Sequence, residues 1–230
     1  MLKTNKSWHK KWWGILLIIF AIFILALIVA SGFYVFDVVQ KIKSGEPANR
    51  NILSRSVIGG KQYSAEGNGN YWIGSAKPKV TIVEFADFAC SYCKNSFSKI
   101  REISVKHKDD VKIIFRDYPM HEESLALAMA ARCAGEQGLF WLMHDKLFQN
   151  QGAAKDQLIE LAKQIGADTV KFSQCLDSDK YAAQIQKDYD AGEELGVTGT
   201  PTWFINGYRV KGDIPYEVFA GVVEELIREY

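Results

Sequence analysis

Two cysteines with two residues between them stand immediately after an apolar run, in the stretch FADFACSYCKNSF at residues 85–97. The preceding stretch, KVTIVEFADF, is nearly continuous in β-branched and aromatic residues, which predicts a strand buried on both faces of a sheet. The next stretch, CSYCKNSFSKIREISVKH, spaces its apolar residues as a helix does, and VKIIFRDYP predicts a second strand. Cys90 therefore lies at the strand-to-helix junction of a β-α-β unit.

The rest of the chain adds a helical block and a second pair of strands. From about 122 to 195, apolar residues recur at intervals near 3.6 and Gly or Asn stands at the breaks, which predicts a series of helices. GVTGTPTWFINGYRVKG predicts a β-hairpin that turns at Asn206 and Gly207, and a last helix begins near Pro215. The predicted order is β-α-β, a helical block, then β-β-α, which is an α/β fold.

The N-terminus carries a separate feature, an uncharged apolar run from Trp12 to Phe36 that is long enough to cross a bilayer. Lysines precede the run, and the positive-inside bias predicts an N-terminus in the cytoplasm and the remainder outside. A cleaved signal peptide is the alternative, because residues 30–32 offer a small-residue cleavage site. The run continues past that site, which favours an uncleaved anchor.

These patterns divide the chain into four parts. We expect a cytoplasmic N-terminus at 1–11, a transmembrane anchor at 12–36, a glycine-containing linker at 37–70 and a globular domain at 71–230. The helical insertion occupies about 122–195 of that domain. A net charge of +1, with no run of Lys and Arg interleaved with aromatic residues, argues against nucleic-acid binding.

A Cys-x-x-Cys pair at the start of a helix suits thiol–disulfide exchange. The unpaired N–H groups and the positive end of the helix dipole stabilise the thiolate of Cys90, which predicts that Cys90 is the attacking thiol. Cys93 lies one turn further along and is placed to resolve a mixed disulfide. An inert structural disulfide between the two is the alternative.

The remaining cysteines, Cys133 and Cys175, are isolated in the sequence and match no zinc-knuckle spacing. His121 and His144 stand beside aromatic residues, where a histidine is more often packed than ligating, so no metal site is expected. Both isolated cysteines lie on apolar-periodic helices of a chain with an even cysteine count, which predicts a structural disulfide between them outside the cytosol. Two buried free thiols are the alternative.

Two further features are expected near the pair. Glu84 interrupts the apolar strand six residues before Cys90, and a buried carboxyl there would have a raised pKa and could exchange a proton with Cys93. The alternative is a Glu84 at the sheet edge, facing water. Thr200 and Pro201 enter a predicted strand, where a proline requires an edge, a bulge or a cis turn.

Residues from about 70 to 230 resemble the DsbA-type thioredoxin-fold thiol–disulfide oxidoreductases, especially their membrane-anchored, BdbD-like bacterial branch. The matching stretches are TIVEFADFACSYC, FRDYPMHEES, AARCAGEQGLFWLMHDKLF and GVTGTPTWFING. The resemblance implies a thioredoxin fold with an inserted all-helical subdomain. It also implies Cys90 as nucleophile, Cys93 as resolving thiol, Glu84 as buried proton acceptor, and Thr200-Pro201 as a cis-proline loop that binds substrate.

One departure from the family concerns Ser91 and Tyr92, which stand where the best-known strong oxidases carry Pro-His. These two residues are expected to contact substrate together with the cis-proline loop, but they supply no imidazole to stabilise the thiolate. The resemblance implies no cofactor. Some BdbD-like relatives bind calcium, but no acidic cluster in this sequence is assigned to it.

The predicted function is therefore that of a membrane-anchored oxidoreductase that donates disulfides to exported proteins. Its partners would be reduced or unfolded exported proteins and a quinone-linked membrane oxidase of the DsbB or VKOR type. The expected location is the bacterial cytoplasmic membrane, with a single span and the catalytic domain outside. An extracytoplasmic reductase or isomerase is one alternative, and a non-catalytic anchored binding domain is another. Isomerases of this superfamily dimerise through an additional N-terminal domain, for which the linker is too short, so a monomer is expected.

Overall fold

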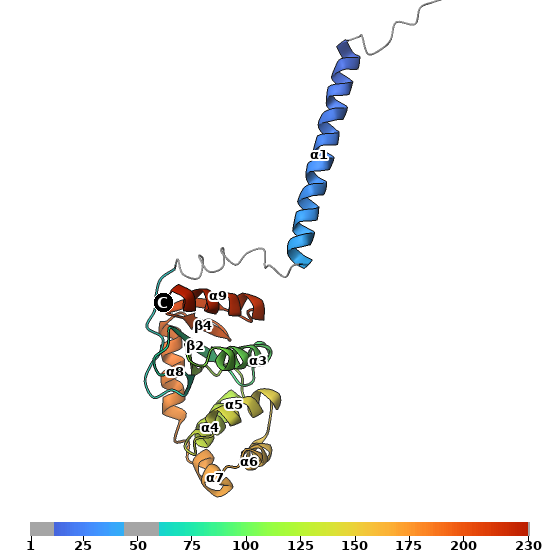
Figure 1. Cartoon of the computed structure of the whole chain (residues 1–230). Coiled ribbons are helices and arrows are strands. Elements are labelled where there is room, and N and C mark those ends of the chain that lie inside the picture. The colour runs from blue at the N-terminus through green and yellow to red at the C-terminus, as the bar shows by residue number, and fades with distance from the viewer. Residues whose placement is uncertain (1–11, 44–59, 230) are drawn as a thin grey trace, which may run out of the picture. The chain divides into compact units, whose positions relative to one another are not determined.

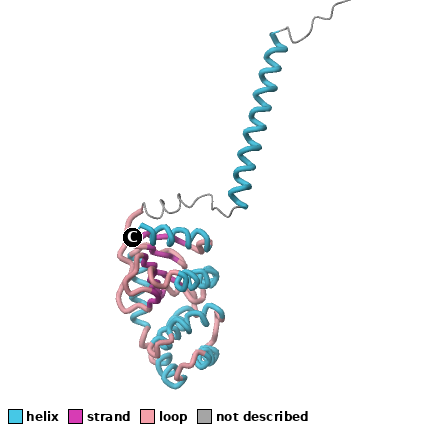
Figure 2. The backbone as a smooth tube through the Cα atoms, viewed as in Figure 1, coloured by secondary structure: helices cyan, strands magenta, loops and turns pink. Residues whose placement is uncertain are grey.

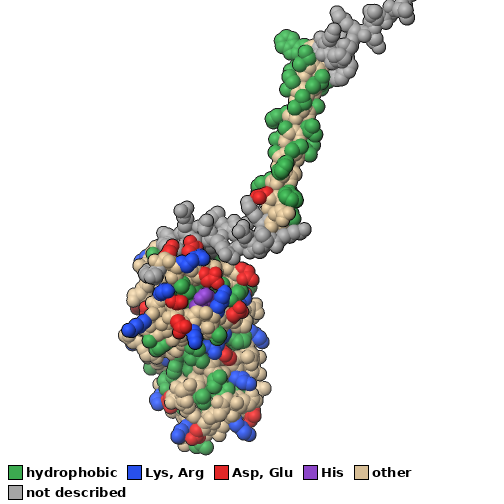
Figure 3. All heavy atoms as spheres, in the orientation of Figure 1, with side chains coloured by type: hydrophobic (Ala, Val, Ile, Leu, Met, Phe, Trp, Pro, Cys, Tyr) green, Lys and Arg blue, Asp and Glu red, His purple; other side chains and the backbone are tan. Residues whose placement is uncertain are grey.

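The computed structural model describes residues 12–43 and 60–229, which form two compact units, an N-terminal helix and a C-terminal domain. The predicted segment 1–11 and part of the predicted linker lie outside the described residues. Helix α1 (Trp12–Lys43) extends beyond the predicted anchor, because no glycine or proline stands between Phe36 and Gly45. Its stretch from Trp12 to Asp37 is long and apolar enough to cross a membrane, although a signal sequence would meet the same criteria. Figure 3 shows hydrophobic side chains along the visible face of this helix.

The C-terminal domain is built on a mixed five-stranded sheet in the order β1-β3-β2-β4-β5, and Figure 2 shows its strands between helices. Its strands are β1 (Trp72–Gly74), β2 (Val80–Ala86), β3 (Val111–Asp117), β4 (Thr202–Ile205) and β5 (Tyr208–Lys211). Its helices are α3 (Ser91–Lys106), α4 (Ser124–Gly135), α5 (Phe140–Gln149), α6 (Lys155–Gln164), α7 (Thr169–Asp177), α8 (Ala182–Glu194) and α9 (Tyr216–Glu229). Only β2 and β3 are parallel, and α3 connects them. The predicted α/β order is confirmed.

Alternate side chains of the central strands enter two different cores. On one face, Ile82 and Ile113 pack with apolar residues of α3 and α9. On the other face, Val83 and Phe85 pack with Phe204 and with residues near the end of α8. Both faces of β2 are therefore covered, which explains its nearly continuous apolar sequence.

The segment that begins at Gly60 differs from the predicted linker because it packs on the sheet. The Tyr63 N–H donates to the Gly207 carbonyl oxygen at 2.9 Å, and Ala65 is buried in a core cluster. Strand β1 then pairs antiparallel with β3. Neither feature has a periodic pattern, since β1 has three residues and residues 60–66 make only isolated contacts.

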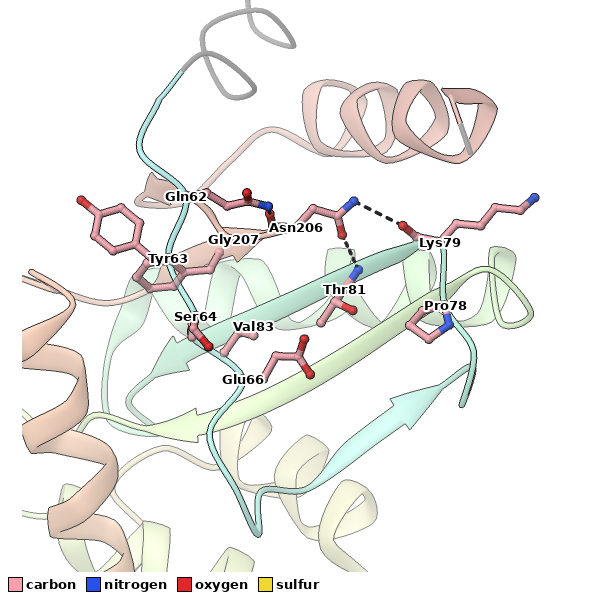
Figure 4. A pocket seen from close by; sticks show the side chains of 12 residues that line it. Gln62, Tyr63, Ser64, Glu66, Pro78, Lys79, Thr81, Val83, Asn206 and Gly207 are labelled. Carbon is pink, nitrogen blue, oxygen red and sulfur yellow. Dashed lines mark hydrogen bonds between the residues drawn. The ribbon is translucent and has the colours of Figure 1, made fainter.

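The predicted hairpin turn is present, with positive φ angles at Asn206 and Gly207. The Asn206 side chain accepts a hydrogen bond from the Thr81 N–H and donates one to the Lys79 carbonyl oxygen, as Figure 4 shows. These residues line a hollow of about 730 Å³ at the start of β2, the opposite end of that strand from Cys90.

The inserted helices α4 to α8 lie between β3 and β4, and Figure 1 shows α4 to α7 gathered at one end of the domain. A disulfide joins Cys133 on α4 to Cys175 on α7, which are 42 residues apart in the sequence. Closing a loop of that length in the unfolded chain gives a stabilisation of about 4 kcal/mol in the chain-entropy model.

A buried network of two arginines and two aspartates attaches these helices to the sheet. Arg116 of β3 and Arg132 of α4 both donate to Asp188 of α8, at 2.9 and 2.6 Å. Arg132 also donates to Asp117 at 2.5 Å. The two positive and two negative charges balance, which is the condition under which buried ionised groups are tolerated.

Candidate active site

Cys90 is the N-cap residue of α3, and Cys93 lies in the first turn of that helix. The loop from β2 holds this junction in place, because the Cys90 N–H donates to the Asp87 carbonyl oxygen at 3.0 Å and the Asp87 carboxylate accepts from the Ala89 N–H at 2.9 Å. Both cysteines are free thiols in this structure. Cys90 is 7% exposed and Cys93 is 0% exposed, so only Cys90 presents sulfur surface to a substrate.

The pKa of Cys90 is lowered to about 5, chiefly by a hydrogen bond from the Cys93 thiol. The Thr200 side chain and the backbone N–H groups of Cys93 and Tyr92 add to this effect, while partial burial opposes it. The two amides belong to the start of α3, where N–H groups have no partner within the helix. Cys90 is therefore largely a thiolate at neutral pH.

Cys93 has the opposite environment. Burial raises its pKa far above the ordinary thiol value, and the hydrogen bond to Cys90 and the charge of Glu84 raise it further. Cys93 is therefore a thiol at every physiological pH. The asymmetry between the two sulfurs is what ordered thiol–disulfide exchange requires, because one sulfur attacks and the other stays protonated until it is needed.

Glu84 lies in the middle of β2, opposite Phe115 of β3 and Trp203 of β4, and is 0% exposed. The structure therefore excludes the solvated-edge alternative. Within the described residues neither carboxyl oxygen has a hydrogen-bond partner. Burial raises the pKa of Glu84 to about 8, so the carboxyl is protonated at neutral pH and available beside Cys93.

The loop before β4 faces the thiol pair. The Thr200–Pro201 peptide bond is cis, and the Thr200 carbonyl oxygen lies 3.4 Å from Sγ of Cys90. The structure thus brings together the predicted Cys90, Cys93, Glu84, Thr200 and Pro201. Ser91 and Tyr92 are exposed at the start of α3 beside them.

Sequence reasoning does not reveal the roles of Asp87 and His121. The buried Asp87 carboxylate accepts from the Met120 N–H at 2.8 Å and lies 2.6 Å from Nδ1 of the half-exposed His121. The hydrogen bond with Asp87 raises the pKa of His121. Asp87 thereby connects the loop before Cys90 to the segment that follows β3. The one sign of this role in the sequence is that Asp87 directly follows an apolar strand.

Gln151 is a second residue that the sequence does not reveal. Its Nε2 donates to the carbonyl oxygens of Phe88 and Cys90, both at 2.9 Å. Because Gln151 follows α5, this contact lets the inserted helices hold the loop that ends in the reactive thiol. Across residues 12–43 and 60–229, no group of three or more His, Cys, Asp or Glu side chains could hold a metal ion.

A family model described as thioredoxin matches residues 66–225. The chain belongs to the thioredoxin family. Disulfide bond formation protein D of Bacillus subtilis is 30% identical over 172 residues, which cover 68% of this chain and 76% of that protein. The crystal structure of oxidised BdbD from the same organism superposes with a TM-score of 0.63 at 27% identity, over 74% of this chain and 100% of that one. These matches place the thioredoxin-family chain in the DsbA-like branch.

Other relatives of this thioredoxin-family chain are much longer. A Na(+)/H(+) antiporter NhaA of Salinispora tropica is 36% identical over 151 residues, which cover 64% of this chain but 23% of the antiporter. The chain thus spans about a quarter of the length of the antiporters that it matches.

The thiol-disulfide exchange protein alpha-DsbA2 of Wolbachia pipientis shares the fold, with a TM-score of 0.65 at 24% identity over 79% of this chain and 99% of that one.

The raised pKa of Glu84 predicts a specific pH dependence of stability. The folded chain keeps this proton up to about pH 8, whereas the unfolded chain releases it near the ordinary glutamate pKa of 4.5. The contribution of the Glu84 proton to the free energy of unfolding is therefore complete below pH 4.5. It is lost, at about 1.4 kcal/mol per pH unit, as the pH rises toward 8. Glu84→Gln should remove this slope from the free energy of unfolding of the reduced chain, measured by urea titration.

The matched control for this experiment is Glu160→Gln on the exposed face of α6, which should keep the wild-type slope. If the free energies of unfolding of Glu84→Gln and wild type run parallel from pH 5 to 8, Glu84 is ionised in the folded chain and the assignment of a proton to it is wrong.

The Gln151 contact predicts an effect on the reactive thiol. In the reduced wild-type chain, the rate of alkylation should rise with an apparent pKa of about 5 and label Cys90 alone. Gln151→Ala should raise that pKa, because the loop that ends in Cys90 loses two hydrogen bonds that hold it in place at the start of α3. The rise should not exceed about one unit, since a hydrogen bond contributes about 1 kcal/mol and one unit equals about 1.4 kcal/mol. Gln164→Ala, an exposed glutamine of α6, is the control and should leave the profile unchanged. Preferential labelling of Cys93 would reverse the two roles.

Proposed function

We propose that the chain is a membrane-anchored thiol–disulfide oxidoreductase that donates the Cys90–Cys93 disulfide to exported proteins. The observation that carries this proposal is the asymmetry of the pair, in which Cys90 has a lowered pKa and Cys93 a raised one. A binding domain without chemistry has no need for a stabilised thiolate. The likeness to disulfide bond formation protein D of Bacillus subtilis supports the same function.

The proposed reaction begins with the oxidised pair. A substrate thiolate attacks Sγ of Cys90, the Cys90–Cys93 bond breaks, and Cys93 leaves with the electron pair. The Glu84 carboxyl, protonated at neutral pH, gives its proton to Cys93. A second substrate thiolate then attacks the substrate sulfur of the mixed disulfide, and Cys90 leaves as a thiolate. Two electrons pass from the two substrate thiols to the chain, and one substrate disulfide forms.

The direction of net transfer follows from the Cys90 thiolate. A lowered thiol pKa stabilises the reduced form, and a stabilised reduced form makes the disulfide the stronger oxidant. Ser91 and Tyr92 supply no imidazole, so the stabilisation of the thiolate comes from the Cys93 thiol, Thr200 and the amides of α3. To act repeatedly, the pair needs reoxidation, for which we propose a quinone-linked membrane oxidase of the DsbB or VKOR type.

Helix α1 is proposed as the anchor. Its uncharged stretch is long enough to span a bilayer, and the lysines before it favour an N-terminus in the cytoplasm. That orientation places the globular domain outside, where disulfides persist. The Cys133–Cys175 disulfide fits this compartment. We propose a single span and a monomer.

A substrate assay tests the proposed direction. The oxidised full chain in detergent, mixed with a reduced unfolded secretory protein, should form substrate disulfides while its own pair becomes reduced, and free thiols should be conserved in total. Cys90→Ser should abolish transfer, because the attacked sulfur is missing, whereas Glu160→Gln should be as active as wild type. A chain that fails to oxidise the substrate but speeds the reduction of insulin by glutathione would instead be a reductase.

A further inference from the structure

A groove of about 440 Å³ adjoins the thiol pair and is lined by Tyr92, by residues 198–202 and by residues 211–213. One wall is the cis-proline loop, whose Thr200 carbonyl oxygen lies 3.4 Å from Sγ of Cys90. A substrate segment that brings its cysteine to Cys90 must therefore pass its neighbouring residues along this groove. The side chains that line the groove are therefore the ones that can distinguish one substrate segment from another.

Two charged side chains line the groove, Asp213 and Lys211, and the negative charge of Asp213 is neutralised within the protein. The Asp213 carboxylate accepts from the Lys99 ammonium at 2.5 Å and from the Ser96 hydroxyl at 2.7 Å. Both donors belong to α3, so the Asp213 carboxylate is already paired within the protein. Its negative charge contributes little to the field in the groove.

The base has no such partner. Lys211 is exposed, and its ammonium donates to the Thr198 hydroxyl at 2.8 Å, a neutral oxygen. In the described part of the chain no carboxylate forms an ion pair with Lys211. Strand pairing sets Lys211 opposite Thr202, which fixes the backbone of Lys211 beside the cis-proline loop. The groove therefore carries one uncompensated positive charge, held over the loop by Thr198.

Tyr92 completes the opposite side of the groove. Tyr92 is 62% exposed, although it lies next to the buried thiols in the sequence. The ring offers apolar surface to an extended segment, while Lys211 offers charge. An exposed aromatic residue and one unpaired ammonium together fit a segment with an acidic side chain close to its cysteine.

We propose that Lys211 makes the groove selective for cysteines that have an acidic residue within a few positions in the sequence. This inference rests on the proposed function and names the substrate class of the same site. Lys211 is a specificity-determining residue and takes no part in the exchange of sulfur bonds. Because the ion pair would be partly exposed, the preference is modest, about threefold to fivefold, and weakens with salt.

The test uses short peptides that differ at one residue near a single cysteine, which is Glu, Gln or Lys, placed on either side. The oxidised full chain in a non-ionic detergent should oxidise two peptide thiols to one disulfide, fastest for Glu and slowest for Lys. Lys211→Gln should reduce the spread among the peptides to less than about twofold. Lys163→Gln, an exposed lysine of α6, should retain the wild-type order.

A binding measurement separates this inference from the proposed function. Labelled peptides with serine in place of cysteine cannot react, so their fluorescence anisotropy with the full chain reports the groove alone. Tighter binding of the Glu peptide that disappears in Lys211→Gln supports the inference even if no peptide is oxidised, in which case the proposed function is wrong. Equal binding of the three serine peptides, or a Glu preference that survives in Lys211→Gln, overturns the inference and leaves the proposed function standing.

Discussion

The hydrogen bond between the Cys93 thiol and the Cys90 sulfur is the interaction on which the site depends. It is the chief cause of the lowered pKa of Cys90, and it adds to burial, which is the chief cause of the raised pKa of Cys93. The first amides of α3 act on Cys90, while burial and the carboxyl of Glu84 act on Cys93. Of two identical residues, Cys90 thereby becomes the attacking thiolate and Cys93 remains a protonated thiol.

The inserted helices contribute to this asymmetry from a distance in the sequence. The Arg116–Asp188–Arg132–Asp117 network attaches them to β3, and the Cys133–Cys175 disulfide closes them on themselves. Attached in this way, they present Gln151 to the carbonyl oxygens before α3. The helical subdomain is thus a support for the reactive loop as well as a cover for the core.

Local patterns predict the elements that local forces decide, and miss those that depend on distant partners. The apolar run of β2, the helical spacing of α3 and the Asn-Gly turn each carry their own signal, and the fold follows from them. Glu84 stands out because an acid inside such a run is costly. Strand β1, Gln151 and the Asp87–His121 pair have no comparable signal, because their roles arise from contacts that join segments far apart in the sequence. The unpaired charge of Lys211 likewise becomes visible only when Lys99 is seen to neutralise Asp213.

The central claim is that stabilisation of the Cys90 thiolate makes the pair an oxidant. The most direct test is the reduction potential of the Cys90–Cys93 couple in the full chain, equilibrated in glutathione buffers and quantified by alkylation of the reduced fraction. A thiol pKa of about 5 lies between those of DsbA and thioredoxin, so we expect a reduction potential between roughly −120 and −200 mV. A value near −270 mV, that of thioredoxin, would contradict it and make the pair a reductant.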